Sequence, residues 1–180
     1  DFMQLYRDRW HEFRQGSLSN TNIRNVIDSM ANEIQEAQPR DSAKWGRISA
    51  SGWRTEINSL KSWLTTRAGW MDGQFRRPPT ISPSPGPITP GFQFTLGGSS
   101  GTIYYTLDGS DPRASGGATS ASATRYTGAV SLAETARVVA RSRVSTTDWS
   151  PPVSGTFYTE LPGIVISELM FHPESPPAGS

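Results

Sequence analysis

The sequence predicts an α+β protein made of two units, an N-terminal segment of three helices followed by an antiparallel β-sandwich. Two observations predict it. Residues 1–77 hold five of the six Trp and one of the 14 Pro of the 180-residue chain, whereas residues 78–180 hold the other 13 Pro. Apolar residues recur every three to four positions in the first part and every second position in much of the second.

The charge balance and the cysteine count exclude several classes of protein. The first part has 12 Lys+Arg against 9 Asp+Glu, a net charge of +3, and the second has 5 against 7, a net charge of −2. Neither part is basic enough to indicate a nucleic-acid partner. No apolar run approaches the ~20 residues of a membrane span. Without cysteine, the chain has neither disulfides nor thiolate metal sites.

The first helix is predicted over about residues 1–15. Its apolar stripe consists of Phe2, Leu5, Tyr6, Trp10 and Phe13, and we expect this face to pack against a core. Gly16 is placed to end the helix in the left-handed conformation. The chain opens on Asp1 without a methionine or a leader, so we expect it to begin inside a longer or processed protein.

The second and third helices carry longer apolar stripes. Ser19 is a natural N-cap for the second, which Pro39 is expected to stop. Ser51 is a candidate cap for the third, which is expected to run to about residue 75. The two stripes are Ile23, Val26, Ile27, Met30, Ile34 and Ala37, and Trp53, Ile57, Leu60, Leu64, Ala68, Met71 and Phe75. Such helices form a compact bundle or a cap on a neighbouring domain, and the many indoles favour the cap.

A proline-rich stretch from Pro78 to Pro90 separates the helices from the strands, because proline continues neither a helix nor a central strand. Beyond it, period-two patterns and turn signals such as Asp108-Gly109 predict short strands. They cover residues 92–96, 103–107, 124–126, 129–132, 136–144 and 153–158. Within residues 136–144, Arg137, Arg141 and Arg143 share one face, which we expect to be solvated. This spacing fits an immunoglobulin/fibronectin-III-like sandwich.

The helical segment resembles the C-terminal helical end of CotH-type spore-coat kinase-like domains. The resemblance covers about residues 1–77 and rests on Trp and Arg positions spread over the predicted helices. They include Arg9-Trp10, Leu18-Ser19, Glu36-Ala37, Lys44-Trp45, Trp53, Glu56-Ile57, Trp63-Leu64, Arg67 and Trp70-Met71. It implies that the nucleotide-contacting and catalytic residues of such kinases lie upstream, so no catalytic or cofactor-binding residue is assigned to this chain.

Residues 78–160 resemble the chitobiase/β-hexosaminidase C-terminal-like domain, a fibronectin-III-like accessory module of secreted bacterial proteins. The diagnostic segment is Ile103-Tyr104-Tyr105-Thr106-Leu107-Asp108-Gly109-Ser110-Asp111-Pro112, with Ala140-Arg141-Ser142 and Trp149-Ser150 further on. The resemblance implies a spacer or domain-organising role. Residues 161–180 form a third division, because Ile164-Val165-Ile166-Ser167-Glu168 resembles the truncated start of a lamin-tail-like domain.

Candidate sites in the two units are sparse. Asp108 and Asp111 are candidates for Ca²⁺, but their spacing is not that of an EF-hand and turn chemistry is the preferred interpretation. Tyr104 and Trp149 are candidates for stacking on a glycan, with packing preferred. His11 has no second ligand at metal spacing, so a surface or bridging role is favoured. For the helical Trp residues, core positions are preferred over sugar stacking.

These observations favour a non-catalytic structural or interaction fragment of a large exported bacterial CotH-related protein, with no cofactor. Its partners are expected to be neighbouring domains of the same chain and, in addition, a cell-surface glycan or protein, with no nucleic acid and no membrane span. Two alternatives stay open. One is a carbohydrate-binding accessory module, and the other is the C-terminal part of a protein kinase. Family resemblance places the protein outside the cell or at its surface.

Overall fold

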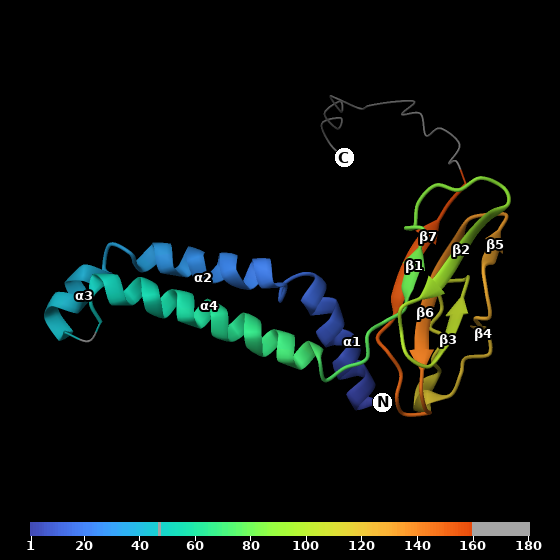
Figure 1. The fold of residues 1–180 in the computed structure, drawn as a ribbon, viewed down its shortest axis with the longest axis horizontal. Helices are drawn as coiled ribbons and strands as arrows, with labels where there is room; N and C mark the ends of the chain where they lie inside the picture. The colour runs from blue at the N-terminus through green and yellow to red at the C-terminus, as the bar shows by residue number, and fades with distance from the viewer. Residues whose placement is uncertain (47, 160–180) are drawn as a thin grey trace, which may run out of the picture.

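The first part of the chain is helical in the computed structural model, which describes residues 1–46 and 48–159 (Figure 1). Four helices precede the first strand within these residues, one more than the sequence predicts. They are α1 (Phe2–Gln15), α2 (Asn20–Ile34), α3 (Gln38–Trp45) and α4 (Ala50–Asp72). The predicted α+β class, with helices before an antiparallel sandwich, is confirmed.

The helix ends show which capping predictions hold. The Oγ of Ser19 accepts the backbone N–H of Asn22 at 3.2 Å and caps α2 as predicted. The cap of α4 is Ser49, and Ser51 lies inside that helix. Gly16 has φ −130°, so the prediction of a left-handed end was wrong. Pro39 does not end α2 but occupies the first turn of α3, where its missing N–H costs no hydrogen bond.

Helices α2 and α4 run antiparallel and form an arm, residues 20–72, with α3 at the end far from the strands (Figure 1). The seam between them is thin, because Ile27, Ala31 and Ala68 are the only buried apolar residues among those of the arm whose burial the structure describes. An ion pair between Lys61 and Asp28 closes one side of the seam. None of the helices in residues 1–46 and 48–159 is long and apolar enough to cross a membrane.

The second part is a sandwich of two antiparallel sheets. One has the order β1-β2-β5 and the other the order β4-β3-β6-β7. The strands are β1 (Thr80–Ser82), β2 (Phe92–Gly97), β3 (Thr102–Thr106), β4 (Thr124–Arg125), β5 (Val130–Leu132), β6 (Ala136–Arg143) and β7 (Val153–Phe157). Only β1 was not predicted from the sequence. It follows Pro79 directly and pairs only with β2, so it is an edge strand, where a neighbouring proline is tolerated.

The core of the sandwich is aromatic and aliphatic. Phe94 of β2 stacks on Phe157 of β7, with ring centroids 5.2 Å apart, and both are fully buried. Val138 and Ala140 of β6 point into the same core, as their alternation predicts. The sandwich therefore buries most of its large hydrophobic residues, whereas the described part of the helical unit buries few of its own.

Three predictions of burial in the helices were wrong. Trp45, Trp63 and Trp70 are each more than half exposed, although helical spacing favoured core positions. Most of the stripe on α1 is not buried either, because Phe2 is 77% and Leu5 60% exposed, although Trp10 and Tyr6 contact the base of the arm. The periodicity is real, but two antiparallel helices bury only the side chains on their common seam.

Candidate functional site: the junction between helices and sandwich

The most elaborate polar site of the described residues lies where α1 meets the sandwich. Its centre is Arg141 of β6, whose side chain is only 4% exposed. Its Nη1 and Nη2 each donate to the carboxylate of Asp8 on α1 at 2.8 Å. Its Nε and Nη2 donate to Asp111 at 2.7 and 2.6 Å, and Nη1 also donates to the Ser150 carbonyl at 2.9 Å. All five donors of the guanidinium are thus used.

The charges at this centre stabilise one another. Burial disfavours the charged form of Arg141, but hydrogen bonds and Coulomb attraction from Asp8 and Asp111 outweigh it and raise its pKa above the ordinary value. A buried arginine between two carboxylates is stable only while both partners are in place. The contact between α1 and β6 is therefore specific in geometry and depends on charge.

The first turn of α1 makes a second contact with the sandwich. The Asp1 carboxylate accepts from the Ser115 hydroxyl at 3.0 Å and from the Gly116 N–H at 3.1 Å, and it pairs with Arg113. One turn further along, the side-chain amide of Gln4 donates weakly to the Ser150 carbonyl at 3.4 Å. Positions 1, 4 and 8 lie on one face of a helix, so the polar face of α1 is the one that docks.

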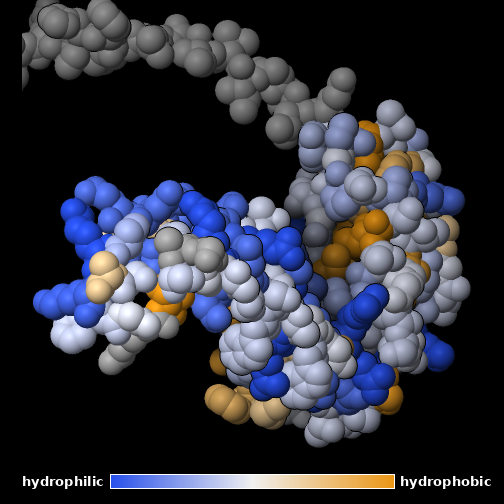
Figure 2. Space-filling view, turned by 60° about the vertical axis from the view of Figure 1, so that its left-hand side comes forward, coloured by the Kyte–Doolittle hydropathy of each residue, from blue (hydrophilic) through white to orange (hydrophobic). Residues whose placement is uncertain are grey.

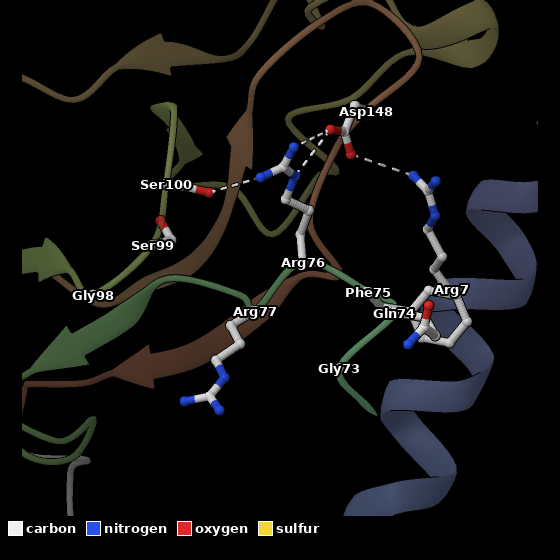
Figure 3. Close-up of a pocket in the computed structure, with 10 residues that line it drawn as sticks. All are labelled: Arg7, Gly73, Gln74, Phe75, Arg76, Arg77, Gly98, Ser99, Ser100 and Asp148. Atoms are coloured by element: carbon white, nitrogen blue, oxygen red, sulfur yellow. Dashed lines mark hydrogen bonds and ion pairs between the residues drawn. The ribbon is translucent and has the colours of Figure 1, made fainter. Parts of the chain in front are cut away.

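A polar pocket opens beside this contact (Figure 3). It is lined by Arg7 of α1, the connecting residues 73–77 and the loop at residues 98–100. Arg76 donates to Oδ2 of Asp148 at 2.9 and 2.6 Å and to the hydroxyl of Ser100 at 3.2 Å. Arg7 approaches the other oxygen of Asp148 at 3.6 Å. Figure 3 shows that Arg77 points away from Asp148, so the arginines do not converge on one point.

The base of the arm is tied to α1 by Asp72. Its carboxylate accepts from Nε1 of Trp10 at 2.9 Å and from Nε of Arg14 at 3.0 Å. The ring of Tyr6 meets that of Phe75 edge-on, with centroids 5.8 Å apart. Helix α1 is therefore held on one side by the sandwich and on another by the end of α4.

The two calcium candidates are engaged in local hydrogen bonds. Asp108 accepts from the N–H and hydroxyl of Ser110, and these bonds lower the pKa of its carboxyl. Asp111 accepts the backbone N–H of Arg113 at 2.9 Å and both bonds from Arg141. Within residues 1–46 and 48–159, no three acidic or histidine side chains are grouped to hold a metal ion.

The two glycan candidates lie next to each other, with the rings of Tyr104 and Trp149 5.8 Å apart. Trp149 is 0% exposed, and its Nε1 donates to the Gly117 carbonyl at 3.0 Å. Arg143 lies over the same indole at 5.4 Å. The indole therefore has no free face for a sugar in this structure, and Tyr104 is only partly exposed.

His11 lies half-buried at the junction, with its Nε2 near the side-chain amide of Gln15. Burial lowers its pKa, while the nearby carboxylates of Asp8 and Asp72 act in the opposite direction. Its hydrogen-bond partner Gln15 is on the same helix, so the choice between a surface and a bridging role stays a prediction. His172 and Glu174 lie outside the described residues, as does the segment resembling a lamin tail.

The prediction that the arginines of β6 lie on a solvated face was wrong for Arg141. Helix α1 and the loop that follows β3 cover that part of the sheet, while Arg137 stays exposed. Sequence reasoning placed Arg141 on the correct face but had no means to know what covers it. The available signal was that two family-like segments, the one ending in Asp111-Pro112 and the one around Arg141, carry opposite charges.

Two family models match separate parts of the chain. Residues 1–71 match the family model described as CotH kinase protein, and residues 94–157 match the model described as Fn3 associated. The chain therefore has a CotH-type helical end followed by an Fn3-like domain, as the resemblances predicted. Together the matches indicate a fragment of a multidomain CotH-related protein. No curated protein and no solved structure matched the chain.

Proposed function

We propose that the sandwich is a domain-organising module that holds the CotH-type helical end at a fixed angle in a large exported protein. The proposed units are residues 1–77, 78–160 and 161–180, the last being the start of a further domain. The observation that carries the proposal is the bonding of Arg141. A spacer that merely followed the helices would not need a buried arginine bonded to both units.

The contacts of α1 support this function. A flexible linker between domains makes few contacts across the boundary. Here the polar face of α1 meets the sandwich through Asp1, Gln4 and Asp8, each bonded to a different group. Such charged hydrogen bonds fix the orientation of α1 on the sandwich more than they strengthen the contact, because each forms only in a narrow geometry.

The test is to remove one charge without changing the shape. Asp8→Asn removes the negative partner of Arg141 on the helical side and leaves the sandwich core untouched. A hydrogen bond to a charged group contributes about 1.5–3 kcal/mol, so we expect weaker docking by about that amount. Spin labels on cysteines introduced at Lys44 in the arm and Glu134 in the sandwich report the distance between the units.

The expected result is a narrow distribution of distances between the two labels when the 180-residue chain keeps Asp8, and a broad distribution when it carries Asp8→Asn. Arg137→Ala is the matched control, because Arg137 lies on the same strand but is exposed. Circular dichroism checks that the sandwich remains folded in each variant. A distribution that stays narrow in Asp8→Asn would refute the organising role.

The match to a CotH kinase model favours a second candidate for the parent protein, phosphoryl transfer by residues upstream of this fragment. In that case the present chain contributes position and stability and no catalytic group. An assay of ATP-dependent phosphorylation by the polypeptide with its preceding residues restored would decide it. We propose an extracellular or cell-surface location, which fractionation of the expressing cells would test.

A further inference from the structure

The polar pocket of Figure 3 holds hydrogen-bond donors that the described residues leave unused. Nε and Nη1 of Arg7 are buried without a hydrogen bond, and Nη1 lies 3.6 Å from the Asp148 carboxylate. The hydroxyl of Ser99, on the other side of the pocket, is also buried without one. The Arg7 side chain is still 22% exposed, so a small rotation brings its nitrogen atoms into the pocket. Because a buried donor without an acceptor costs free energy, the pocket favours a ligand rich in oxygen acceptors.

The charge of the pocket is positive. Three arginines and one aspartate line it, which gives a formal charge of +2. Arg76 uses three of its five donors on Asp148 and Ser100 and keeps two. Arg77 is exposed and has no hydrogen bond or ion pair with a described residue. The ligand that this pocket favours is therefore an anion.

The donors are spread over the pocket. They come from α1, from the connecting residues 73–77 and from the loop at residues 98–100. A compact ion contacts only part of such a set, whereas a molecule with an anionic group at each end reaches donors on two sides. The cavity has a volume of about 510 Å³, which is the size of a small-molecule site.

A second cavity of about 490 Å³ shares part of its lining with the first, including Phe75 and Gly98. Its own charged pair, Arg14 and Asp72, is internally balanced. The remaining lining is more apolar and includes Trp10, Pro78, Pro79 and Pro151. The two cavities thus form one groove with a cationic half and a more apolar half. Most of the surface visible in Figure 2 is hydrophilic, with hydrophobic atoms in separate patches.

We propose that this groove binds a small organic anion that carries phosphate or carboxylate groups at two ends. Arg7 and Ser99 bind one of these groups and Arg77 binds the other, while the apolar half takes the carbon body. Because α1 belongs to the helical unit and Ser99 to the sandwich, the bound molecule also bridges the two units. The inference goes beyond the proposed function, although it uses the same docked arrangement.

Isothermal titration calorimetry at constant ionic strength tests the site in the 180-residue chain. One probe is fructose 1,6-bisphosphate, a sugar with a phosphate at each end, and the other is citrate, whose groups are carboxylates. Inorganic phosphate is the compact anion for comparison. The variants are Arg7→Gln and Arg77→Gln. Arg9→Gln is the matched control, because Arg9 lies on the same helix and pairs with Glu12 away from the groove.

We expect at least one of the two probes to bind more tightly than inorganic phosphate, and the tighter one identifies the anionic group. Arg7→Gln should weaken its binding at least about tenfold, since a buried charged donor is lost, and the exposed Arg77→Gln at least about threefold. Arg9→Gln should change it less than about twofold. Circular dichroism checks the fold of each variant, and Arg77→Gln removes no contact within the described chain.

Two results would overturn the proposal. One is that neither probe binds more tightly than inorganic phosphate. The other is an equal loss in Arg9→Gln and in the two groove variants, because the anion would then be attracted by general surface charge.

Failure of this site and failure of the organising role are distinguishable with the labels at Lys44 and Glu134. A narrow distance distribution without binding of either probe would refute the site and leave the organising role intact. A broad distribution that narrows when the tighter probe is added would uphold the site. It would also show that the sandwich alone does not fix the angle of the helices.

Discussion

At the scale of single residues, the junction depends on side chains whose charge is controlled by their surroundings. Arg141 stays charged although it is buried, because Asp8 and Asp111 bond to it from two different units. His11 is the opposite case. Burial lowers its pKa, so the neutral ring is the form that fits the docked helix.

The lowered pKa of His11 predicts a pH dependence. The ordinary pKa is 6.5, so below it the unfolded chain binds a proton that the folded chain resists. Stability is therefore full above that value and falls as the pH decreases through it. Melting temperatures at about pH 7.5 and about pH 5.5 check this. The melting temperature should fall more between these two pH values in the chain with His11 than in the His11→Gln variant.

Comparing the chain that has His11 with the His11→Gln variant isolates the effect of the His11 imidazole. His172 is present in both, as are all the carboxylates, so their titration cancels in the difference. An equal decrease in both chains would mean that His11 is as hydrated in the fold as in the unfolded state. The pKa shift would then have no consequence for stability.

At the scale of elements, the short 3₁₀ turn Ser115–Gly117 contacts both the helical side and the sandwich side of the junction. Its Ser115 and Gly116 bond to Asp1, the N-cap residue of α1, and its Gly117 carbonyl accepts from the buried Trp149. Gly117 has φ +87°, and a Cβ added there would lie 2.0 Å from the Thr146 carbonyl oxygen. The turn thus needs glycine for conformation and for space.

Gly117→Ala should therefore destabilise the chain by about 1–3 kcal/mol, the usual cost of a strained backbone, and more if the clash moves Trp149. Gly116→Ala is the control. Gly116 has a similar φ of +78°, but no atom lies within 4 Å of its added Cβ. Urea unfolding followed by Trp fluorescence compares the two. If they cost the same, the close approach of Thr146 plays no part in stability.

At the scale of the whole molecule, the two units differ in what holds them together. The sandwich has an aromatic core centred on Phe94 and Phe157, whereas its contact with the helices is mostly ionic. Ionic contacts weaken in salt, and exposed ones weaken most. Arg76 and Asp148 form such a partly exposed pair, and Arg141 a buried one.

Salt should therefore loosen the docking without unfolding the sandwich. Between about 0.01 M and about 1 M salt the screening length falls from about 30 Å to about 3 Å. We expect the distance distribution between labels at Lys44 and Glu134 to broaden over this range. The circular dichroism of the strands should stay constant. A distribution that is insensitive to salt would show that the ion pairs do not hold the units together.

Much of the fold could be predicted because it depends on local spacing. The strand from Ala136 to Arg143 was expected within one residue of its end, and Ser19 was expected to cap the second helix. The short helix at Gln38–Trp45 was missed, because Pro39 signals a helix end as well as a first turn. A residue such as Pro39, which fits either of two local structures, adopts the one that the surrounding residues favour.

Little of the junction could be predicted, since it joins residues far apart in the chain. Asp8 and Arg141 are separated by 133 positions, and neither lies in a motif that names the other. A charged residue on a strand face is usually solvated, which is why Arg141 was expected in water. Only the docking of α1 reverses that expectation.

The sequence by itself determined where most of the helices and strands form and which side of them is apolar, because the repeat of a helix or a strand sets these within a few residues. The short helix α3 and the edge strand β1 were the exceptions. The tertiary structure decided which sides are covered. It turned the polar side of α1 toward the sandwich and left Trp63 and Trp70 of the arm open. The reason is physical, since burial depends on what approaches a surface, and periodicity carries no information about the partner.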